Sequence, residues 1–160
     1  MANAAFSKFN QFVADVAGGI HNLLTGTSDT FYILLTNTLP VAGDSVVDTT
    51  TTPCTIKSSS NAVEVASGYG YTKGGLSCGT VTGSQESGTF KFTLGTDPVF
   101  AASGGSIGPF QYAVLYNASK GTSATRPVIG FWAYPTSTTL LAGETFTVDL
   151  DQTNGVLTIA

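Results

Sequence analysis

The sequence predicts a mainly β protein, an antiparallel β-sandwich with one short N-terminal helix or arm. Two segments show the strand pattern most clearly, because apolar and polar residues alternate through TFKFTL (89–94) and ETFTVDL (144–150), the period of a strand with one buried face. Only 10% of the residues are charged, against about 25% in ordinary soluble domains. The polar surface therefore consists mainly of Thr, Ser, Asn and Gly. The length favours a single domain over residues 1–160.

The N-terminal segment carries the one helical pattern in the chain. Phe6, Phe9 and Phe12, followed by further apolar residues at three- to four-residue spacing, predict an amphipathic helix or arm within residues 1–19 that ends at the glycine pair 18–19. Two roles are open for it. The helix can cap one end of the β-core, or the three Phe rings can dock on a partner protein.

The first half of the chain continues with strands and turns. IHNLL (20–24) and FYILLTN (31–37) flank a turn-rich TGTSD segment, which predicts a β-hairpin. Residues 44–60, rich in Thr and Ser with a central Pro, are expected to form an extended loop or a poorly paired edge. The glycines of SGYGYTKGG (67–75) favour tight turns with positive φ, over which the two tyrosines pack.

The second half carries a series of short strand patterns. Predicted strands lie at 78–82, 88–94, 98–102, 110–117, 127–134, 145–150 and 155–159. Short strands at this spacing are typical of a β-sandwich, either a plain one or one like a jelly roll. Asn154 and Gly155 predict a C-terminal hairpin. Phe131 and Trp132 are adjacent in a strand and must face opposite sides, so one is expected in the core and the other near a surface or interface.

The residues that an enzyme would need are scarce. GGSIG (104–108) matches the nucleophile pattern G-x-S-x-G, but that chemistry needs a strand-to-helix elbow and a later histidine. The one histidine, His21, lies far upstream, so Ser106 is predicted to belong to a glycine-rich turn. The acidic segment 149–154 lacks the Gly and Glu of a calcium loop. We therefore predict no enzyme, no catalytic residue, no cofactor and no metal site.

Charge and cysteine content bear on partners and location. The net charge of −4 and the pI near 4.6 argue against a nucleic-acid partner. No apolar run is long enough for a membrane helix, and the first residues lack an export signal. Assembly in the cytoplasm is therefore expected, with Cys54 and Cys78 as free thiols rather than a disulfide. Two cysteines and one histidine give no zinc-ligand spacing.

Several segments, taken in order along nearly the whole chain, resemble small structural proteins of tailed-bacteriophage particles. These are Phe9-Asn10, HNLLTGTSDTFYILLTNTLPVA, GYGYTKGG, SGGSIGPFQYAVLYN, RPVIGFWAY and AGETFTVDLDQTNGVLTIA. The resemblance implies a β-rich, non-enzymatic virion protein, of the capsid decoration or cement type. Such a protein would bind the major capsid protein lattice as a homo-oligomer and stabilise the head. The Thr-rich stretch 48–60 departs from the pattern.

The resemblance leaves the position on the particle open. In a capsid decoration protein, Phe6, Phe9 and Phe12 are the candidate anchors, since apolar contacts would replace salt-dependent ion pairs. The alternative is a tail or baseplate module that contacts host glycans. Its stacking platforms would be aromatic side chains, namely Tyr69, Tyr71, Trp132 and Tyr134. Copy number separates the two, because decoration requires many copies per particle.

Overall fold

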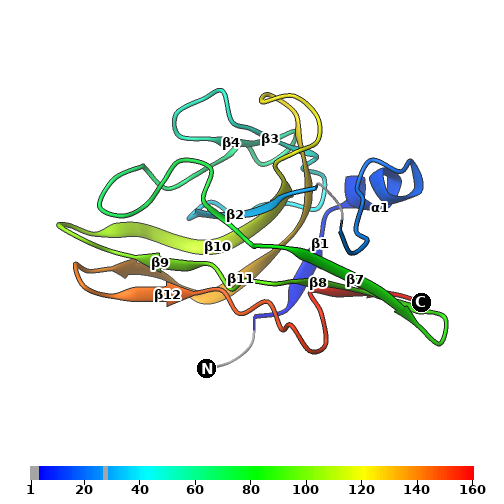
Figure 1. Cartoon of the computed structure of the whole chain (residues 1–160). Coiled ribbons are helices and arrows are strands. Elements are labelled where there is room, and N and C mark those ends of the chain that lie inside the picture. Colours follow the sequence, from blue (N-terminus) through cyan, green and yellow to red (C-terminus); the bar gives the residue numbers. More distant parts are fainter. Residues whose placement is uncertain (1–3, 27–28) are drawn as a thin grey trace.

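A computed structural model of the chain describes residues 4–26 and 29–160. It is mainly β, with antiparallel sheets and one short helix, as the sequence predicts (Figure 1). The strands divide among an eight-stranded, a three-stranded and a two-stranded sheet. Figure 1 shows β7, β8, β9 and β12 in a layer below β2 and β10, with β3 and β4 above them.

The large sheet has the order β5-β4-β3-β11-β10-β2-β6, and β1 also pairs with β11. Its strands are β1 (Phe6–Lys8), β2 (Phe31–Thr36), β3 (Val46–Asp48), β4 (Thr55–Lys57), β5 (Ala62–Val63), β6 (Leu76–Ser77), β10 (Ile107–Asn117) and β11 (Arg126–Leu140). The three-stranded sheet joins β13 (Leu157–Ile159), β8 (Thr89–Leu94) and β7 (Val81–Glu86). The two-stranded sheet joins β12 (Thr145–Thr147) and β9 (Val99–Ala101).

The central strands of the large sheet are buried on both faces. Along β2, Phe31, Ile33 and Leu35 belong to the main core, whereas Leu34 belongs to a second core that includes residues of β3, β4 and β5. Both faces of such a strand must therefore be apolar, which explains the unbroken run FYILL. The fold thus has two hydrophobic cores, one on each side of a shared sheet.

The neighbouring aromatic residues of β11 face different hydrophobic cores. Trp132 packs in the main core and Phe131 in the second core, so they do face opposite sides. Each side chain is only 8% exposed. Phe131 is buried because β3 to β5 supply a second buried layer, whereas Trp132, although largely buried, also lines a groove at the surface.

The N-terminal segment packs on the domain itself. Helix α1 (Asn10–Ala17) follows β1 and ends at Gly18, so it is shorter than the predicted span of 1–19, of which residues 1–3 lie outside the described residues. Phe9 is 0% exposed, and its ring centroid lies 5.3 Å from that of Phe131. Phe12 is buried in the main core. The capping alternative is the arrangement observed.

Gly130 of β11 gives β1 the room to approach. A Cβ at Gly130 would collide with the ring of Phe6 and the carbonyl oxygen of Ser7. In the register of the two strands, Phe6 lies opposite Trp132 and Lys8 opposite Gly130. A glycine is therefore required at this position by close packing.

The Thr/Ser-rich stretch 44–60 holds two short strands toward one edge of the large sheet, so it matches the predicted edge rather than the extended loop. It contains β3 and β4, which pair with each other. The buried Asp44 carboxylate accepts hydrogen bonds from the backbone N–H groups of Val41, Ser59 and Ser60 and from the Ser60 hydroxyl. These hydrogen bonds join the segment before β3 to the segment after β4, a contact that composition alone does not indicate.

Two predicted hairpins are also wrong. Residues 20–24 form no strand, and β2 pairs with β10 and β6; of the expected turn at 25–29, residues 27–28 lie outside the described residues. The segment at Asn154-Gly155 connects different sheets, since β12 pairs with β9 and β13 pairs with β8. The patterns at 31–37 and near the C-terminus identified strands but not their partners, and the pattern at 20–24 identified no strand.

The glycine-rich segment 67–75 does form tight turns. Gly68, Gly70, Gly74 and Gly75 all have positive φ, and a Cβ at Gly75 would collide with the backbone of Ile33. Its two tyrosines have different surroundings, because Tyr71 is buried and Tyr69 is 59% exposed.

Candidate functional site

A groove of about 720 Å³ is lined by residues of β1, β11, β12 and the segment 149–156. We call it the aromatic groove, and the residues that define it are Phe6, Trp132, Tyr134, Phe146, Thr147 and Asp149. Trp132 and Tyr134 are two residues apart on β11 and so share one face of the strand. Two of the four aromatic residues named from the sequence as stacking platforms thus lie in one groove.

The aromatic side chains of the groove are held by mutual packing. The rings of Phe6 and Trp132 lie 4.9 Å apart between centroids, and those of Tyr134 and Phe146 lie 4.9 Å apart at 74°. Phe110, from the main core, supports Phe146 at 4.9 Å. Such tilted and edge-to-face contacts are the preferred geometries of aromatic pairs. The aromatic side of the groove is therefore preorganised.

The polar groups of the groove are largely unpaired. Within the described part of the chain, the indole N–H of Trp132 and the hydroxyls of Tyr134 and Thr147 make no hydrogen bond. Asp149 accepts one hydrogen bond through Oδ1, from the backbone N–H of Asp151 at 3.0 Å, and its Oδ2 accepts none from a described residue. Donors and an acceptor thus remain for a ligand.

The carboxylates at the groove give it negative charge. Hydrogen bonds from the backbone and the side chain of Asn154 lower the pKa of Asp151, so this carboxylate is ionised at neutral pH. Burial raises the pKa of Tyr134, which keeps the phenol protonated and able to donate. The groove therefore combines neutral donors with an anionic rim.

The other residues singled out in the sequence are dispersed. Of the candidate anchors, only Phe6 lines the groove, because Phe9 and Phe12 are buried in separate cores. Ser106 is exposed in the turn before β10, as predicted. Cys54 and Cys78 are both buried and free, which agrees with the prediction of unpaired thiols.

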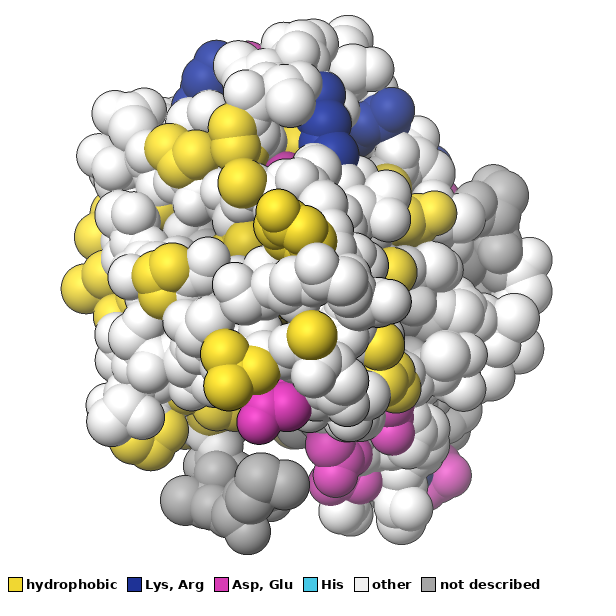
Figure 2. Space-filling model, turned by 90° about the vertical axis from the view of Figure 1, so that its left-hand side faces the viewer, with side chains coloured by type: hydrophobic (Ala, Val, Ile, Leu, Met, Phe, Trp, Pro, Cys, Tyr) yellow, Lys and Arg dark blue, Asp and Glu magenta, His cyan; other side chains and the backbone are white. Residues whose placement is uncertain are grey.

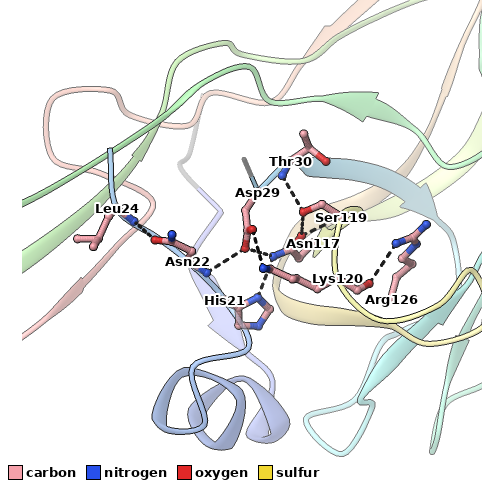
Figure 3. Close-up of polar contacts among 9 residues, drawn as sticks. All are labelled: His21, Asn22, Leu24, Asp29, Thr30, Asn117, Ser119, Lys120 and Arg126. Atoms are coloured by element: carbon pink, nitrogen blue, oxygen red, sulfur yellow. Dashed lines mark hydrogen bonds and ion pairs between the residues drawn. The ribbon is translucent and has the colours of Figure 1, made fainter. Parts of the chain in front are cut away.

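A buried polar network around His21 was not predicted from the sequence (Figure 3). Asn117 on β10 donates through Nδ2 to Asp29 at 2.9 Å and lies 3.2 Å from Nδ1 of His21. Asp29 also accepts from the backbone N–H of Asn22 at 2.9 Å and pairs with Lys120 at 3.0 Å. The network fastens the segment after α1 to the end of β10.

The protonation states of this network follow from burial and hydrogen bonding. Burial lowers the pKa of His21, although Asp15 and Asp29 oppose the effect. Burial alone would raise the pKa of Asp29, but the hydrogen bonds from Asn22 and Asn117 and the contact with Lys120 outweigh it and lower the pKa. At neutral pH the network therefore holds a neutral imidazole beside an ionised carboxylate.

A second buried carboxylate, Glu64, organises the glycine-rich segment. Its oxygens accept hydrogen bonds from the Tyr71 hydroxyl at 2.8 Å and from the backbone N–H groups of Gly74 at 2.6 Å and Cys54 at 3.0 Å. Burial, together with Glu64, raises the pKa of Cys54 to about 12. The thiol therefore stays protonated and is a poor nucleophile. These contacts are structural.

A smaller pocket of about 280 Å³ lies beside this network. Its lining includes Lys73 and Arg126 together with Tyr32. Lys73 donates to the Thr52 hydroxyl, and Arg126 donates to the carbonyl oxygen of Lys120. Neither cation has a carboxylate within ion-pair distance in the described ranges. The fold thus brings together two cations that are far apart in sequence.

Two further findings limit the kinds of site that the described residues form. Residues 4–26 and 29–160 contain no group of three or more His, Cys, Asp or Glu side chains placed to hold a metal ion. None of the helices in this described part has the length and hydropathy of a membrane span. In the comparisons with known proteins, no family model, curated protein or solved structure matches the chain.

Proposed function

We propose that this protein is a non-enzymatic structural protein of a tailed-bacteriophage particle, a capsid decoration protein that binds the major capsid protein lattice and stabilises the head. The proposal rests on the distribution of charged side chains at one end of the molecule. Figure 2 shows Lys and Arg side chains along the upper edge of this face and Asp and Glu along the lower edge. Between them lies a band of uncharged side chains with separate hydrophobic ones.

Internal pairing of carboxylates contributes to this neutral surface. Half of the ten acidic residues are buried, namely Asp15, Asp29, Asp44, Asp48 and Glu64. Their charges are used within the fold, where they fix loops through hydrogen bonds and ion pairs. The surface available to a partner therefore contains fewer charges than the composition suggests, which suits a contact made by apolar and neutral hydrogen-bonding groups.

The proposed attachment surface is the end of the sandwich that carries Tyr69 and Leu141, which we call the tip patch. These side chains are 59% and 62% exposed. Their segments adjoin, because Ser103 donates a backbone hydrogen bond to Tyr69 and Gly143 donates one to Ala102. An exposed aromatic residue beside an exposed leucine is a suitable centre for a protein contact.

The test is occupancy on capsids that lack the protein. A double variant, Tyr69→Ser with Leu141→Ser, should fold as the native protein does and lose at least about tenfold in capsid affinity, as expected for hot-spot residues. Ile159→Ser is the matched control, because Ile159 is also an exposed apolar residue but lies on β13. Native occupancy by the double variant would exclude the tip patch, and failure of the native protein to bind would exclude decoration.

The second candidate function is a tail or baseplate module that contacts host glycans. The specific observation in its favour is that Trp132 and Tyr134 lie together in the aromatic groove. Densitometry of purified particles distinguishes the two functions, because a decoration protein is present in hundreds of copies and a tail-tip module in only a few.

A further inference from the structure

We infer that the aromatic groove is a binding site for a neutral oligosaccharide. The inference concerns this protein wherever it sits on a particle, so it does not depend on the capsid contact proposed above. It is argued from the size of the groove, its ring surfaces, its unpaired polar atoms and its charge.

The size and lining of the groove suit a ligand of a few sugar rings. Its volume of about 720 Å³ falls within the usual range of about 300–1,000 Å³ for small-molecule sites. The aromatic side chains Phe6, Trp132, Tyr134 and Phe146 supply apolar surface, on which the C–H faces of a sugar ring can pack. Their mutual contacts fix them before a ligand arrives, so little side-chain freedom is lost on binding.

The unpaired polar atoms match hydroxyl groups. Trp132 is largely buried, yet its indole nitrogen is not among the fully enclosed unpaired atoms, so it reaches solvent. This N–H and the Tyr134 hydroxyl can donate, while Asp149 Oδ2 can accept. Sugar hydroxyls both donate and accept, so they can satisfy all three groups. An apolar ligand would instead leave them desolvated and unpaired.

The negative charge of the groove favours neutral saccharides over acidic ones. Asp149 and Asp151 both line the groove. Lys91 donates to the carbonyl oxygen of Thr153 and to neither carboxylate, although its charge contributes to the lowered pKa of Asp151. An acidic sugar or a phosphorylated ligand would bring a second negative charge beside them. Neutral sugars avoid this repulsion, and their hydroxyl groups can still donate hydrogen bonds to the carboxylates.

The chain contains its own reporter, because Trp132 is its single tryptophan. We would titrate the full-length protein with chitotriose, cellotriose and maltotriose as neutral probes and with tri-galacturonic acid as the acidic probe. The expected result is a saturable change in tryptophan emission with at least one neutral trisaccharide and at least tenfold weaker binding of the acid. No saturable response to any neutral probe, confirmed by calorimetry, would overturn the inference, as would tighter binding of the acid.

The matched variants are Tyr134→Phe and Tyr112→Phe. Each removes a hydroxyl that makes no hydrogen bond in the described residues and keeps the ring, but Tyr112 packs against the second core, away from the groove. Tyr134→Phe should weaken binding of the neutral probe about tenfold with an unchanged melting temperature, and Tyr112→Phe should bind as the native protein does. Native affinity in Tyr134→Phe, or equal losses in both variants, would contradict the assigned site.

Capsid occupancy of Tyr134→Phe separates this inference from the proposed function. We expect Tyr134→Phe to occupy capsids normally while it binds the sugar poorly. Sugar binding by a protein that never occupies capsids would support the groove and reject decoration. Capsid occupancy without a response to any neutral probe would support decoration and reject the groove as a sugar-binding site.

Discussion

At the scale of single residues, His21 links stability to pH. Its Nδ1 faces the amide N–H₂ of Asn117 at 3.2 Å, so it can only accept there, and the neutral imidazole carries its proton on Nε2. Asn117 is held in this orientation because its Oδ1 accepts from the backbone N–H and the hydroxyl of Ser119. A second proton on the imidazole would therefore place two donors against each other.

The pKa of His21 is lower in the folded protein than its usual value of 6.5. The unfolded chain therefore binds more protons as the pH falls below about 6.5, so stability is complete above that pH and decreases below it. Urea unfolding at several values between pH 8 and pH 5 should show a falling free energy of unfolding. In His21→Asn this dependence should be absent above pH 5, and its persistence there would assign the effect to another group.

A second residue-scale prediction concerns Tyr71, whose hydroxyl donates to Glu64 and accepts from the backbone N–H of Leu35. Tyr71→Phe leaves both of these buried groups with one partner fewer. The expected loss in the free energy of unfolding is about 2 kcal/mol, the usual cost of an unsatisfied buried group. Tyr112→Phe, which removes a hydroxyl without a hydrogen bond in the described residues, should cost less than about 0.5 kcal/mol.

At the scale of elements, the N-terminal segment is part of the folded core. Phe9→Ala should reduce the free energy of unfolding by roughly 3–5 kcal/mol, because it removes a fully buried ring. Deletion of residues 1–12 should lower thermal stability for the same reason. Val13→Ser, on an exposed position of the same helix, is the control and should change stability by less than about 0.5 kcal/mol. A stable deletion variant that loses capsid binding would instead restore the anchor hypothesis.

Strand patterns in the sequence predicted where strands lie but not which strands pair with each other. The alternation in TFKFTL identified β8, whose bounds of 89–94 nearly match the prediction of 88–94. The same kind of pattern at the C-terminus suggested a hairpin, yet β12 and β13 lie in different sheets. Alternation depends on which face of a strand is buried, whereas pairing depends on the path of the whole chain.

At the scale of the whole molecule, the distribution of charge leads to a prediction about salt. The tip patch is apolar, so capsid binding should change less than about threefold between roughly 0.1 M and 1 M NaCl, a range over which exposed ion pairs are strongly screened. A fall of tenfold or more would contradict the apolar contact. The double variant Lys73→Ala with Arg126→Ala would then test whether the smaller pocket, which these two cations line, binds the capsid.

The sequence by itself determined the fold class, the single N-terminal helix and most strands, because these depend on local periodicity and turn residues. Only the tertiary structure decided that residues 44–60 are ordered, that Phe131 and Trp132 are both buried, and that Trp132 and Tyr134 share a groove with Asp149. The physical reason is that burial of a polar side chain or of a second strand face requires partners distant in the chain. No local pattern records where those partners come to lie.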